Sequence, residues 1–310
     1  MHIDIVTPAF NVAPYLVHAI SSVLAQTHHD WTMTIVDDGS TDGTAAVAAS
    51  FTDPRLRLVC QRNAGVSAAR NRGLAASDAD AVLFLDGDDW LSEDALSNLS
   101  AALRADSRAI AAVGPFARVR SGTRGVGRVR CPPSGDLLEP LLISNLFANG
   151  GHVLIRRSAA VAVGPFLTSL SYGEDWEFWV RLACLGLFAA VSGRGPLLFV
   201  RERRGGAYAG MAARPESFSP CMDAIFGNPA LCARLSLETI SCLRRRAEAE
   251  NDWIVGRELI RHGRRREGRL FLCRSVRRAP SFRRLVLLAA GMLPTASIGP
   301  FRPYPAADTP

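Results

Sequence analysis

The stretch Ala81-Val82-Leu83-Phe84-Leu85-Asp86-Gly87-Asp88-Asp89-Trp90 joins an apolar run of strand length to three carboxylates. Side chains alternate along a strand, so Asp86 and Asp88 share one side of the chain at the strand's carboxyl end. Two such carboxylates repel each other unless a cation lies between them, and Mg²⁺ and Mn²⁺ prefer oxygen ligands. The stretch therefore predicts a metal that holds a diphosphate. It also fits a solvated acidic turn in which Asp89 or Ser92 caps the next helix.

Strand and helix patterns alternate on both sides of this stretch. The expected strands are residues 3–7, 31–36, 56–60 and 81–85, and the expected helices are residues 14–25, 41–49 and 67–76. This alternation favours an α/β fold with a doubly wound, mainly parallel sheet. Ligands bind such sheets at the carboxyl ends of the strands. Polar clusters at residues 8–11, 37–40 and 86–89 lie at those ends, so we expect one site along that edge.

The second half of the chain has a less regular pattern. Residues 118–135 are rich in Gly, Arg and Pro and predict a long loop or an irregular hairpin, whereas residues 174–185 predict an amphipathic helix. A further helix is expected at residues 136–147, with extended segments at 150–156 and 196–201. Beyond Gly210 the pattern is helical, with helices at residues 251–262, 265–276 and 281–292. We therefore expect a C-terminal helical extension.

The composition allows one large globular domain, alone or with an extension. The chain has 310 residues, of which 48% are hydrophobic and 21% charged. No apolar window is long enough to cross a bilayer, and the first residues form a strand pattern without a basic run, so we expect a cytoplasmic protein. The seven cysteines are scattered without a Cys-x-x-Cys pair, which favours reduced thiols.

Positive charge is concentrated near the C-terminus. The net charge of the chain is +7, and residues 244–284 alone hold 14 Arg against five acidic residues. Such a segment can face nucleic acid, anionic lipid or water. Few aromatic residues lie among these arginines, so we expect no nucleic acid partner.

An apolar run at residues 285–293 is too short to span a membrane and is preceded by basic residues. The flanking arginines are Arg274, Arg277, Arg278, Arg283 and Arg284. Two interpretations remain open. The segment attaches peripherally to an anionic membrane, or its apolar face docks on the rest of the protein.

Five motifs follow one another along the chain. They are Thr7-Pro8-Ala9-Phe10-Asn11, Val36-Asp37-Asp38-Gly39-Ser40-Thr41-Asp42-Gly43-Thr44, Asn63-Ala64-Gly65-Val66-Ser67-Ala68-Ala69-Arg70-Asn71-Arg72-Gly73, Leu85-Asp86-Gly87-Asp88-Asp89 and Gly173-Glu174-Asp175-Trp176-Glu177-Phe178-Trp179-Val180-Arg181-Leu182. In this order they resemble family 2 glycosyltransferases of the GT-A fold, of the inverting, bacterial type. The resemblance covers about residues 1–205. It implies a nucleotide-sugar-binding half at 1–95 and an acceptor-binding half at 96–205, with a basic helical extension at 206–310.

The resemblance implies a donor site made of ten residues: Pro8, Phe10, Asn11, Asp38, Ser40, Arg70, Asn71, Asp86, Gly87 and Asp88. Asp86 and Asp88 would ligate Mn²⁺ or Mg²⁺. Asp38 matches the position that contacts uracil in the family, although an Asx turn or helix cap would also use Asp there. The planar fork of Arg70 suits the donor phosphate or ribose. The alternative is an exposed arginine on a helix.

The motif at the start of the helix at residues 174–185 carries the implied catalytic base, Asp175. Glu174 and Trp176 would bind the acceptor. Adjacent residues on a helix do not share a face, so the two acids are expected to have different roles. The alternative is that both acids have no catalytic role and only stabilise the helix through the positive end of its dipole, by about 0.3–1 kcal/mol each.

The implied reaction is a single in-line displacement that inverts the anomeric centre. It would move a sugar from a UDP-linked donor to a saccharide or lipid-linked acceptor, as in cell-surface polysaccharide synthesis. Some members of the fold supply a late histidine as metal ligand, but residues 193–206 contain none; Arg201 and Arg203 lie there and are candidates for binding diphosphate. His152 has no partner motif and is expected to be structural.

Two alternatives remain open. A sugar-nucleotide pyrophosphorylase would carry a Gly-rich loop with Arg just after the first strand, where this chain has Pro8-Ala9-Phe10-Asn11. A non-catalytic saccharide- or membrane-binding protein could retain the same fold, but Asp88 and Asp175 are both present. Hydrolysis of a nucleotide-sugar donor separates a transferase from the non-catalytic protein.

Overall fold

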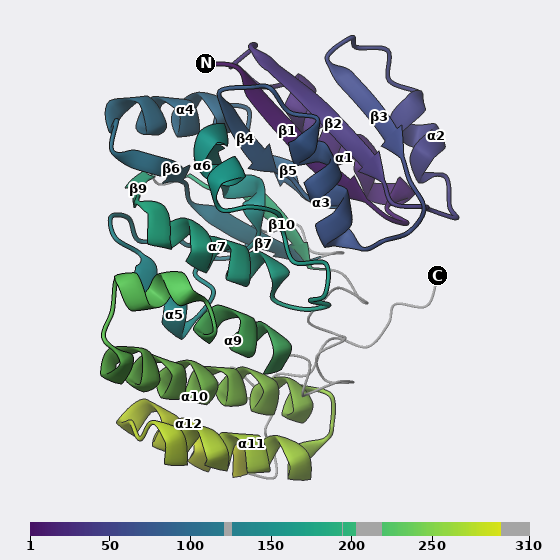
Figure 1. Cartoon of the computed structure of the whole chain (residues 1–310). Coiled ribbons are helices and arrows are strands. Elements are labelled where there is room, and N and C mark those ends of the chain that lie inside the picture. Colours follow the sequence, from purple (N-terminus) through teal and green to yellow (C-terminus); the bar gives the residue numbers. More distant parts are fainter. Residues whose placement is uncertain (121–125, 194, 203–218, 293–310) are drawn as a thin grey trace. The chain divides into compact units, whose positions relative to one another are not determined.

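The structure is a computed structural model that describes residues 1–120, 126–193, 195–202 and 219–292 (Figure 1). The chain divides into two compact units. Unit 1 comprises Met1–Leu141 and Asn145–Arg203, and unit 2 comprises Leu142–Ser144 and Arg204–Pro310. The predicted site residues all belong to unit 1.

A seven-stranded sheet forms the centre of unit 1 (Figure 1). In spatial order its strands are β3 (Leu56–Cys60), β2 (Trp31–Asp37), β1 (Ile3–Ala9), β4 (Ala81–Phe84), β8 (Val153–Arg156), β6 (Ala109–Val113) and β9 (Leu187–Ala190). β3, β2, β1 and β4 are parallel, β8 is antiparallel to β4 and β6, and β9 is parallel to β6. The mainly parallel α/β sheet expected from the sequence is confirmed.

A second, three-stranded sheet in unit 1 follows the order β5 (Trp90–Leu91), β10 (Leu198–Glu202) and β7 (Phe116–Arg120). Phe199 of β10 pairs with Trp90 of β5. This pairing brings the late part of unit 1 beside the acidic turn that follows β4, although the two segments are far apart in the sequence.

Helices connect and cover the strands of unit 1. They are α1 (Ala13–Leu24), α2 (Thr44–Ala49), α3 (Val66–Ala75), α4 (Ala95–Ala105), the 3₁₀ helix η1 (Gly150–His152), α6 (Arg157–Ala162) and α7 (Glu174–Leu185). The residues of α5 (Leu138–Ile143) divide between the units, up to Leu141 in unit 1 and from Leu142 in unit 2. All seven residues of β1 are buried, as a central strand covered on both faces requires. Gly73 lets α3 approach β1, because a Cβ there would lie 2.2 Å from Val6 Cγ1.

Two helices differ from the lengths expected from the sequence. The expected helix at 136–147 is shorter, because Asn145 Oδ1 accepts a hydrogen bond from the Phe147 N–H and favours a local turn. In unit 2, the helix expected at 251–262 already begins at Leu237. Ser236 caps it by accepting from the Thr239 N–H over 3.2 Å.

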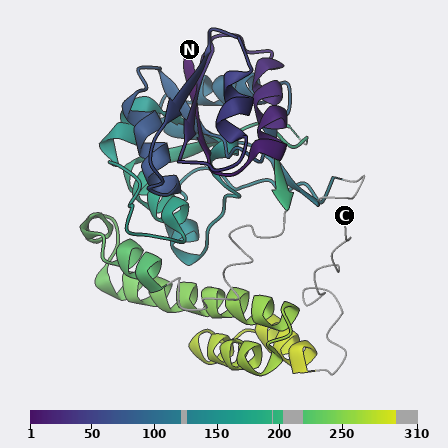
Figure 2. The same ribbon diagram turned by 90° about the vertical axis from the view of Figure 1, so that its right-hand side faces the viewer.

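Unit 2 is helical, as the sequence predicts for the C-terminal extension (Figure 2). Its elements include α9 (Ser219–Phe226), the 3₁₀ helix η3 (Pro229–Ala233), α10 (Leu237–Arg261), α11 (Arg265–Arg278) and α12 (Phe282–Met292). A Cβ on Gly256 would lie 2.8 Å from the Gly268 carbonyl oxygen, so glycine allows α10 and α11 to pack closely. Trp253, Ile260 and Leu272 form the core between them. Within the described ranges, we find no helix with the length and apolar character of a membrane span.

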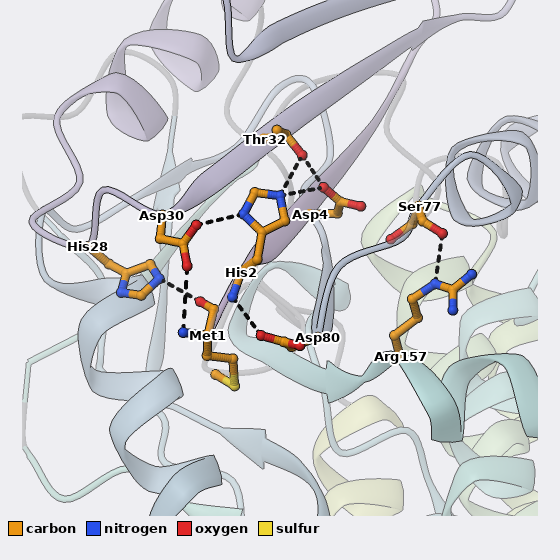
Figure 3. A network of polar contacts seen from close by, with 9 residues as sticks. All are labelled: Met1, His2, Asp4, His28, Asp30, Thr32, Ser77, Asp80 and Arg157. Carbon is orange, nitrogen blue, oxygen red and sulfur yellow. Dashed lines mark hydrogen bonds and ion pairs between the residues drawn. The ribbon is translucent and has the colours of Figure 1, made fainter.

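A polar network joins the amino ends of the strands in unit 1 (Figure 3). His2 Nδ1 lies 2.8 Å from Asp30 Oδ1, and the His2 N–H donates to Asp80 Oδ2 over 2.8 Å. The amino terminus of Met1 lies 3.5 Å from Asp30 Oδ2. The hydrogen bond from His2 holds the pKa of Asp30 below its ordinary value. Each of these acids therefore meets a donor or a cation.

Candidate active site

The acidic turn after β4 packs against the loop that follows β1. The Asp89 N–H donates to the Asp86 carbonyl oxygen over 3.1 Å and closes the turn. A Cβ on Gly87 would lie 3.1 Å from Val12 Cγ2 and 3.3 Å from the Pro8 carbonyl oxygen, so a larger residue would displace the turn. The structure thus brings Pro8, Gly87 and the two predicted metal ligands to one edge of the sheet.

Three carboxylates crowd this turn. Asp89 is buried and accepts hydrogen bonds from Asn149 Nδ2 and from the Arg201 main-chain N–H, the latter over 2.8 Å. Burial raises the pKa of Asp89 well above its ordinary value, and the charges of Asp88 and Asp86 raise it further. Asp89 therefore favours its neutral form, and a bound cation would neutralise the negative charge that Asp86 and Asp88 bring to the turn.

Asp86 and Asp88 fit a cation that they share with a ligand. Among the residues that the structure describes, no group of three or more His, Cys, Asp or Glu side chains is arranged to hold a metal ion. Mg²⁺ is often held by only one or two carboxylates, with substrate phosphates and waters as its other ligands. The two carboxylates fit that shared arrangement. They do not fit a site built from protein ligands alone.

Arg201 of β10 lies beside the same turn. Its Nε donates to the Asp88 carbonyl oxygen over 3.0 Å, and its Nη2 lies 3.1 Å from His18 Nδ1. The guanidinium carbon lies 4.7 Å from the centre of the Trp90 ring, which stacks on His18 at 4.4 Å. Burial, and then the charge of Arg201, lower the pKa of His18. Arg203, the other predicted diphosphate ligand, lies outside the described residues.

The loop after β1 is joined to the loop after β2. The Asn11 N–H donates to Ser40 Oγ over 3.0 Å, and Asn11 Oδ1 accepts from the Thr41 N–H over 2.9 Å. Asn11 has a φ of 51°, a left-handed conformation for which Asn is among the most frequent residues. Next to it, the ring of Phe10 is 47% exposed. An exposed ring beside two polar loops can stack on a nucleobase.

The carboxylate of Asp38 is buried and bonded within the protein. Its Oδ1 accepts from Gln61 Nε2 over 2.7 Å and from the Ala64 N–H over 2.9 Å, and its Oδ2 accepts from the Gly65 N–H over 2.8 Å. Asp38 therefore holds the loop that leads into α3. A contact between Asp38 and uracil stays a prediction.

Arg70 of α3 is buried, so the alternative of an exposed helical arginine is wrong. Its Nη1 donates to Glu174 Oε1 and its Nη2 to Asp86 Oδ1, both over 2.9 Å. Burial acts to lower the pKa of the guanidinium, but the carboxylates of Asp86, Glu174 and Asp175 raise it above its ordinary value. Arg70 therefore stays charged and joins the end of β4 to the start of α7.

Asp175 lies in the first turn of α7, at the positive end of the helix dipole. Its Oδ1 accepts from the Trp176 N–H over 2.6 Å and its Oδ2 from Asn145 Nδ2 over 3.3 Å. Burial raises the pKa of Asp175 to about 7; the charge of Glu174 adds to the rise, and that of Arg70 opposes it. A carboxyl group with a pKa near neutrality is well matched to general-base catalysis.

The polar side-chain groups of two predicted site residues, Asn71 and Trp176, form hydrogen bonds with main-chain atoms. Asn71 Nδ2 donates to the Phe166 carbonyl oxygen over 2.8 Å, and Asn71 Oδ1 accepts from the Phe166 N–H over 2.7 Å. Trp176 is 4% exposed, and its Nε1 donates to the Leu141 carbonyl oxygen over 2.6 Å. The geometry therefore makes Trp176 a core residue rather than a surface for an acceptor, because its position on α7 faces the interior.

His152 has the surroundings of a structural histidine. It is fully buried, its Nε2 accepts from the Ala148 N–H over 3.1 Å, and its Nδ1 lies 2.8 Å from the Gly114 carbonyl oxygen. Burial lowers the pKa of His152 to about 4. The ring is therefore neutral at pH 7 and satisfied on both nitrogens.

Three amide side chains contact site carboxylates that sequence patterns did not connect to them. Gln61, Asn145 and Asn149 donate to Asp38, Asp175 and Asp89, respectively. Each amide lies in an irregular segment outside the helices and strands. No periodicity or motif distinguishes them, so only the folded contacts identify them.

These loops and carboxylates lie within a segment that matches a known family. The model of the family described as glycosyl transferase family 2 matches residues 4–163. The chain belongs to glycosyl transferase family 2. All ten residues of the predicted donor site fall within the matched residues, whereas Glu174, Asp175 and Arg201 lie beyond them.

Two curated relatives resemble the chain over about a hundred residues. Glycosyltransferase GlyA of Streptococcus pneumoniae is 37% identical over 99 residues, which are 31% of this chain and 14% of GlyA. The putative teichuronic acid biosynthesis glycosyltransferase TuaG of Bacillus subtilis is 38% identical over 97 residues, 30% of this chain and 38% of TuaG. The matched segment thus spans well under half of either relative.

Solved structures share the fold over almost the whole chain. TarS 1–349 of S. aureus, in complex with UDP, matches with a TM-score of 0.64 and 16% identity over 93% of this chain and 90% of that one. The mannosyltransferase PcManGT of Pyrobaculum calidifontis, in complex with GDP-Man and Mn²⁺, matches with a TM-score of 0.59 and 20% identity over 97% and 82%. At these identities the likeness shows a common fold, which is GT-A.

Proposed function

We propose that this family 2 protein is an inverting glycosyltransferase. It moves a sugar from a UDP-linked donor to a saccharide or lipid-linked acceptor in cell-surface polysaccharide synthesis. The observation that carries the proposal is the link from Asp86 through Arg70 to Glu174, the residue next to Asp175, which we take as the base. The UDP in TarS and the teichuronic acid role named for TuaG support the donor and the pathway class.

We assign the donor and acceptor roles to different parts of unit 1. Residues 1–95 bind the donor, residues 96–205 bind the acceptor, and residues 206–310 form the basic extension. Phe10 stacks on the base, while Asn11 and Ser40 hold the two loops around it. We assign Asp38 to the base edge on the acceptor capacity that its three internal bonds leave, although its carboxylate is buried in the structure.

The mechanism assigns one task to each end of the cluster. Asp86 and Asp88 would hold Mg²⁺ or Mn²⁺ together with the diphosphate, and the ion would stabilise the charge of the leaving group. Asp175 takes the proton of the acceptor hydroxyl as its oxygen attacks the anomeric carbon. The bond from that carbon to the diphosphate oxygen breaks, and its electron pair leaves with the diphosphate. Attack from the face opposite the leaving group inverts the centre.

Arg201 supplies a positive charge on the side of the turn that carries Asp88. Its guanidinium is held by Trp90 and His18, so it is already oriented before a ligand arrives. We assign it to the diphosphate, whose oxygens match the planar fork of an arginine.

A screen of nucleotide sugars tests the function. Thermal stabilisation and slow donor hydrolysis would be measured with and without Mn²⁺, using UDP- and GDP-linked sugars. We expect stabilisation by a UDP-sugar that depends on Mn²⁺, together with hydrolysis that disappears in Asp175→Asn. Binding without hydrolysis or transfer would favour a non-catalytic saccharide-binding protein. Formation of a nucleotide sugar from a sugar phosphate and UTP would favour a pyrophosphorylase.

We place the reaction in the cytoplasm, at the membrane surface, with α12 as the attachment element. Phe282, Leu285 and Val286 are 83%, 50% and 48% exposed, and their spacing of three and four residues puts them on one face of the helix. Arg284 and Leu288 occupy the opposite side, where Arg284 pairs with Glu250 at 2.9 Å and Leu288 packs on the core of unit 2. An apolar face turned to solvent beside a basic helix matches an anionic lipid interface.

Not all of the arginines expected from the sequence to contact lipid are available for that contact. Arg274 and Arg278 bind the buried Asp252 at 2.7 and 2.8 Å and so hold α11 on α10. Arg266 and Arg277 are exposed on the side of α11 opposite its buried residues, and their spacing of eleven places them on one face. We assign the lipid contacts to this pair, at about 1 kcal/mol for each arginine near anionic lipid.

Flotation with vesicles tests the attachment. We expect the protein to float with phosphatidylglycerol vesicles at low salt and to be released at high salt. Phe282→Ser and Arg266→Gln/Arg277→Gln should each reduce flotation, whereas Leu237→Ser, which changes a 73% exposed leucine on α10, should not. Failure to float at low salt, or equal losses in all variants, would contradict the assignment.

A further inference from the structure

We propose that Arg70 is a positioning residue that connects the donor edge to the catalytic base through Asp86 and Glu174, and is not a phosphate ligand. The inference rests on the proposed function, because it explains how the two halves of that site are kept at a set distance. The family resemblance alone assigned Arg70 to the donor.

The guanidinium joins two elements that are distant in the sequence. Glu174 lies 104 residues from Arg70 and Asp86 lies 16 residues from it. Each carboxylate receives one Nη nitrogen over 2.9 Å, so both outer nitrogens are used. A lysine has a single nitrogen on a flexible stem and could not span both carboxylates in this way. The planar fork is therefore what the geometry requires.

Burial argues against a role in binding phosphate. The Arg70 side chain is 5% exposed, whereas Asp86 is 27% and Glu174 is 15% exposed. A ligand at the edge therefore reaches the carboxylates before it reaches the guanidinium. The Nε of Arg70 is buried without a hydrogen-bond partner among the described residues. If Arg70 served stability alone, its Nε–H would be expected to donate a hydrogen bond, because an unpaired buried donor destabilises the folded state.

Arg70 also sets the electrostatic surroundings of the base. Among the described residues, the groups that act on the Asp175 carboxyl group are Glu174 on its own helix, Arg70 on α3, Asp86 after β4, and the Asn145 amide. Of these four, Arg70 carries the positive charge. Without it, two carboxylates would surround Asp175 and the base would keep its proton to a higher pH.

Three substitutions test the inference. Arg70→Gln removes the charge, Arg70→Lys keeps the charge but not the fork, and Arg72→Gln, an exposed arginine on the same helix, is the matched control. The measurements are the ¹³C titration of the Asp175 carboxyl group, calorimetric binding of UDP with Mn²⁺, and kcat with the nucleotide sugar found in the screen.

For Arg70→Gln we expect the pKa of Asp175 to rise by about one unit and kcat to fall about 10²-fold. The Kd for UDP should change by less than about threefold, because the guanidinium does not touch the donor. Arg70→Lys should leave the titration near that of the wild type and still lose turnover. The Arg72→Gln control should match the wild type in all three measurements.

A loss of UDP affinity of about tenfold or more, with the Asp175 titration unchanged, would show a phosphate ligand and overturn the inference. If both Arg70 variants fail to fold, Glu174→Gln replaces them: turnover should fall with UDP affinity unchanged, and normal turnover would overturn the inference. A wild-type protein that binds no UDP refutes the proposed donor. The Asp175 titration in the Arg70 variants would still test the positioning role.

Discussion

The two ends of the central sheet hold their acidic residues in opposite ways. At the amino ends of the strands, Asp30 and Asp80 meet His2 and the amino terminus, and the pKa of Asp30 lies below its ordinary value (Figure 3). At the carboxyl ends, burial and neighbouring charges raise the pKa of Asp89 and Asp175. Hydrogen-bond donors and cations favour the ionised acid at the amino end, whereas burial and neighbouring carboxylates oppose the ionisation of Asp89 and Asp175 at the carboxyl end.

The comparison indicates that the acids at the amino end serve the stability of the fold, whereas those at the carboxyl end serve the site. Exposed pairs such as that of Asp30 contribute little each, typically about 0.2–1 kcal/mol. Crowded, half-buried carboxylates lower the stability of the apo protein but prepare it for a cation and for an acceptor proton. Substitutions at the two ends should therefore separate activity from stability.

The largest effect is expected from Asp175→Asn. The variant cannot accept the acceptor proton, so kcat should fall roughly 10³-fold, while the affinity for UDP stays near that of the wild type. The comparison partner is Asp30→Asn at the amino edge, which should keep kcat within about twofold. Steady-state kinetics and calorimetry check both. A variant that turns over normally, or that loses UDP affinity in place of kcat, would exclude the base role.

The next largest effect is expected from Asp88→Asn. Loss of one carboxylate from the turn should lower transfer about 10²- to 10³-fold and remove most of the thermal stabilisation that Mn²⁺ adds to UDP. Asp80→Asn, at the other end of β4, should leave the Mn²⁺ response intact. Full activity in a folded Asp88→Asn protein would refute metal ligation by this residue.

The pH dependence of the reaction should report the raised pKa of Asp175. The base works only when ionised, so kcat/KM should rise with pH and level off above about 7. An aspartate with an ordinary pKa would instead give this rise in kcat/KM near pH 4. A profile that is flat from pH 5 to 8 would show that Asp175 is not the limiting base.

The smallest effect is expected from Asp30→Asn on stability. The lowered pKa of Asp30 means that its contribution is present above its ordinary pKa and is lost as the pH falls through the lowered value. Because the side chain is 59% exposed, the loss at pH 7 should be only about 0.5 kcal/mol. Urea unfolding checks it, and a loss of several kcal/mol would show that the amino-edge network matters more than its exposure indicates.

Sequence patterns predicted the carboxyl edge well, because strand alternation and parallel topology place residues that follow β1, β2 and β4 side by side. They could not predict the partners of Arg70, since Glu174 lies 104 residues away and no local periodicity links them. The same limit applies to Asn145 and Asn149, which bind site carboxylates from irregular segments.

Trp176 shows a different limit of sequence reasoning. The motif placed it beside two acids that were expected to be functional, but a residue one position further along a helix turns by about 100°. That rotation takes its ring into the core, where Nε1 donates to the Leu141 carbonyl oxygen. Position within a motif therefore did not indicate which side chain faces the site.

The most direct test of the opposition between the two ends is the pH dependence of unfolding for the wild type and Asp175→Asn. The raised pKa of Asp175 means that ionising it destabilises the folded state, so the contribution of Asp175 to the stability of the wild type should fall as the pH rises from about 4 to 7. Relative to the wild type, Asp175→Asn should gain roughly 2 kcal/mol between pH 4 and pH 8 while losing turnover. The account would be contradicted if the difference in free energy of unfolding between the two proteins did not change with pH, or if it came to favour the wild type at pH 8. Either result would mean that the ionised Asp175 at the carboxyl end of the sheet does not destabilise the protein.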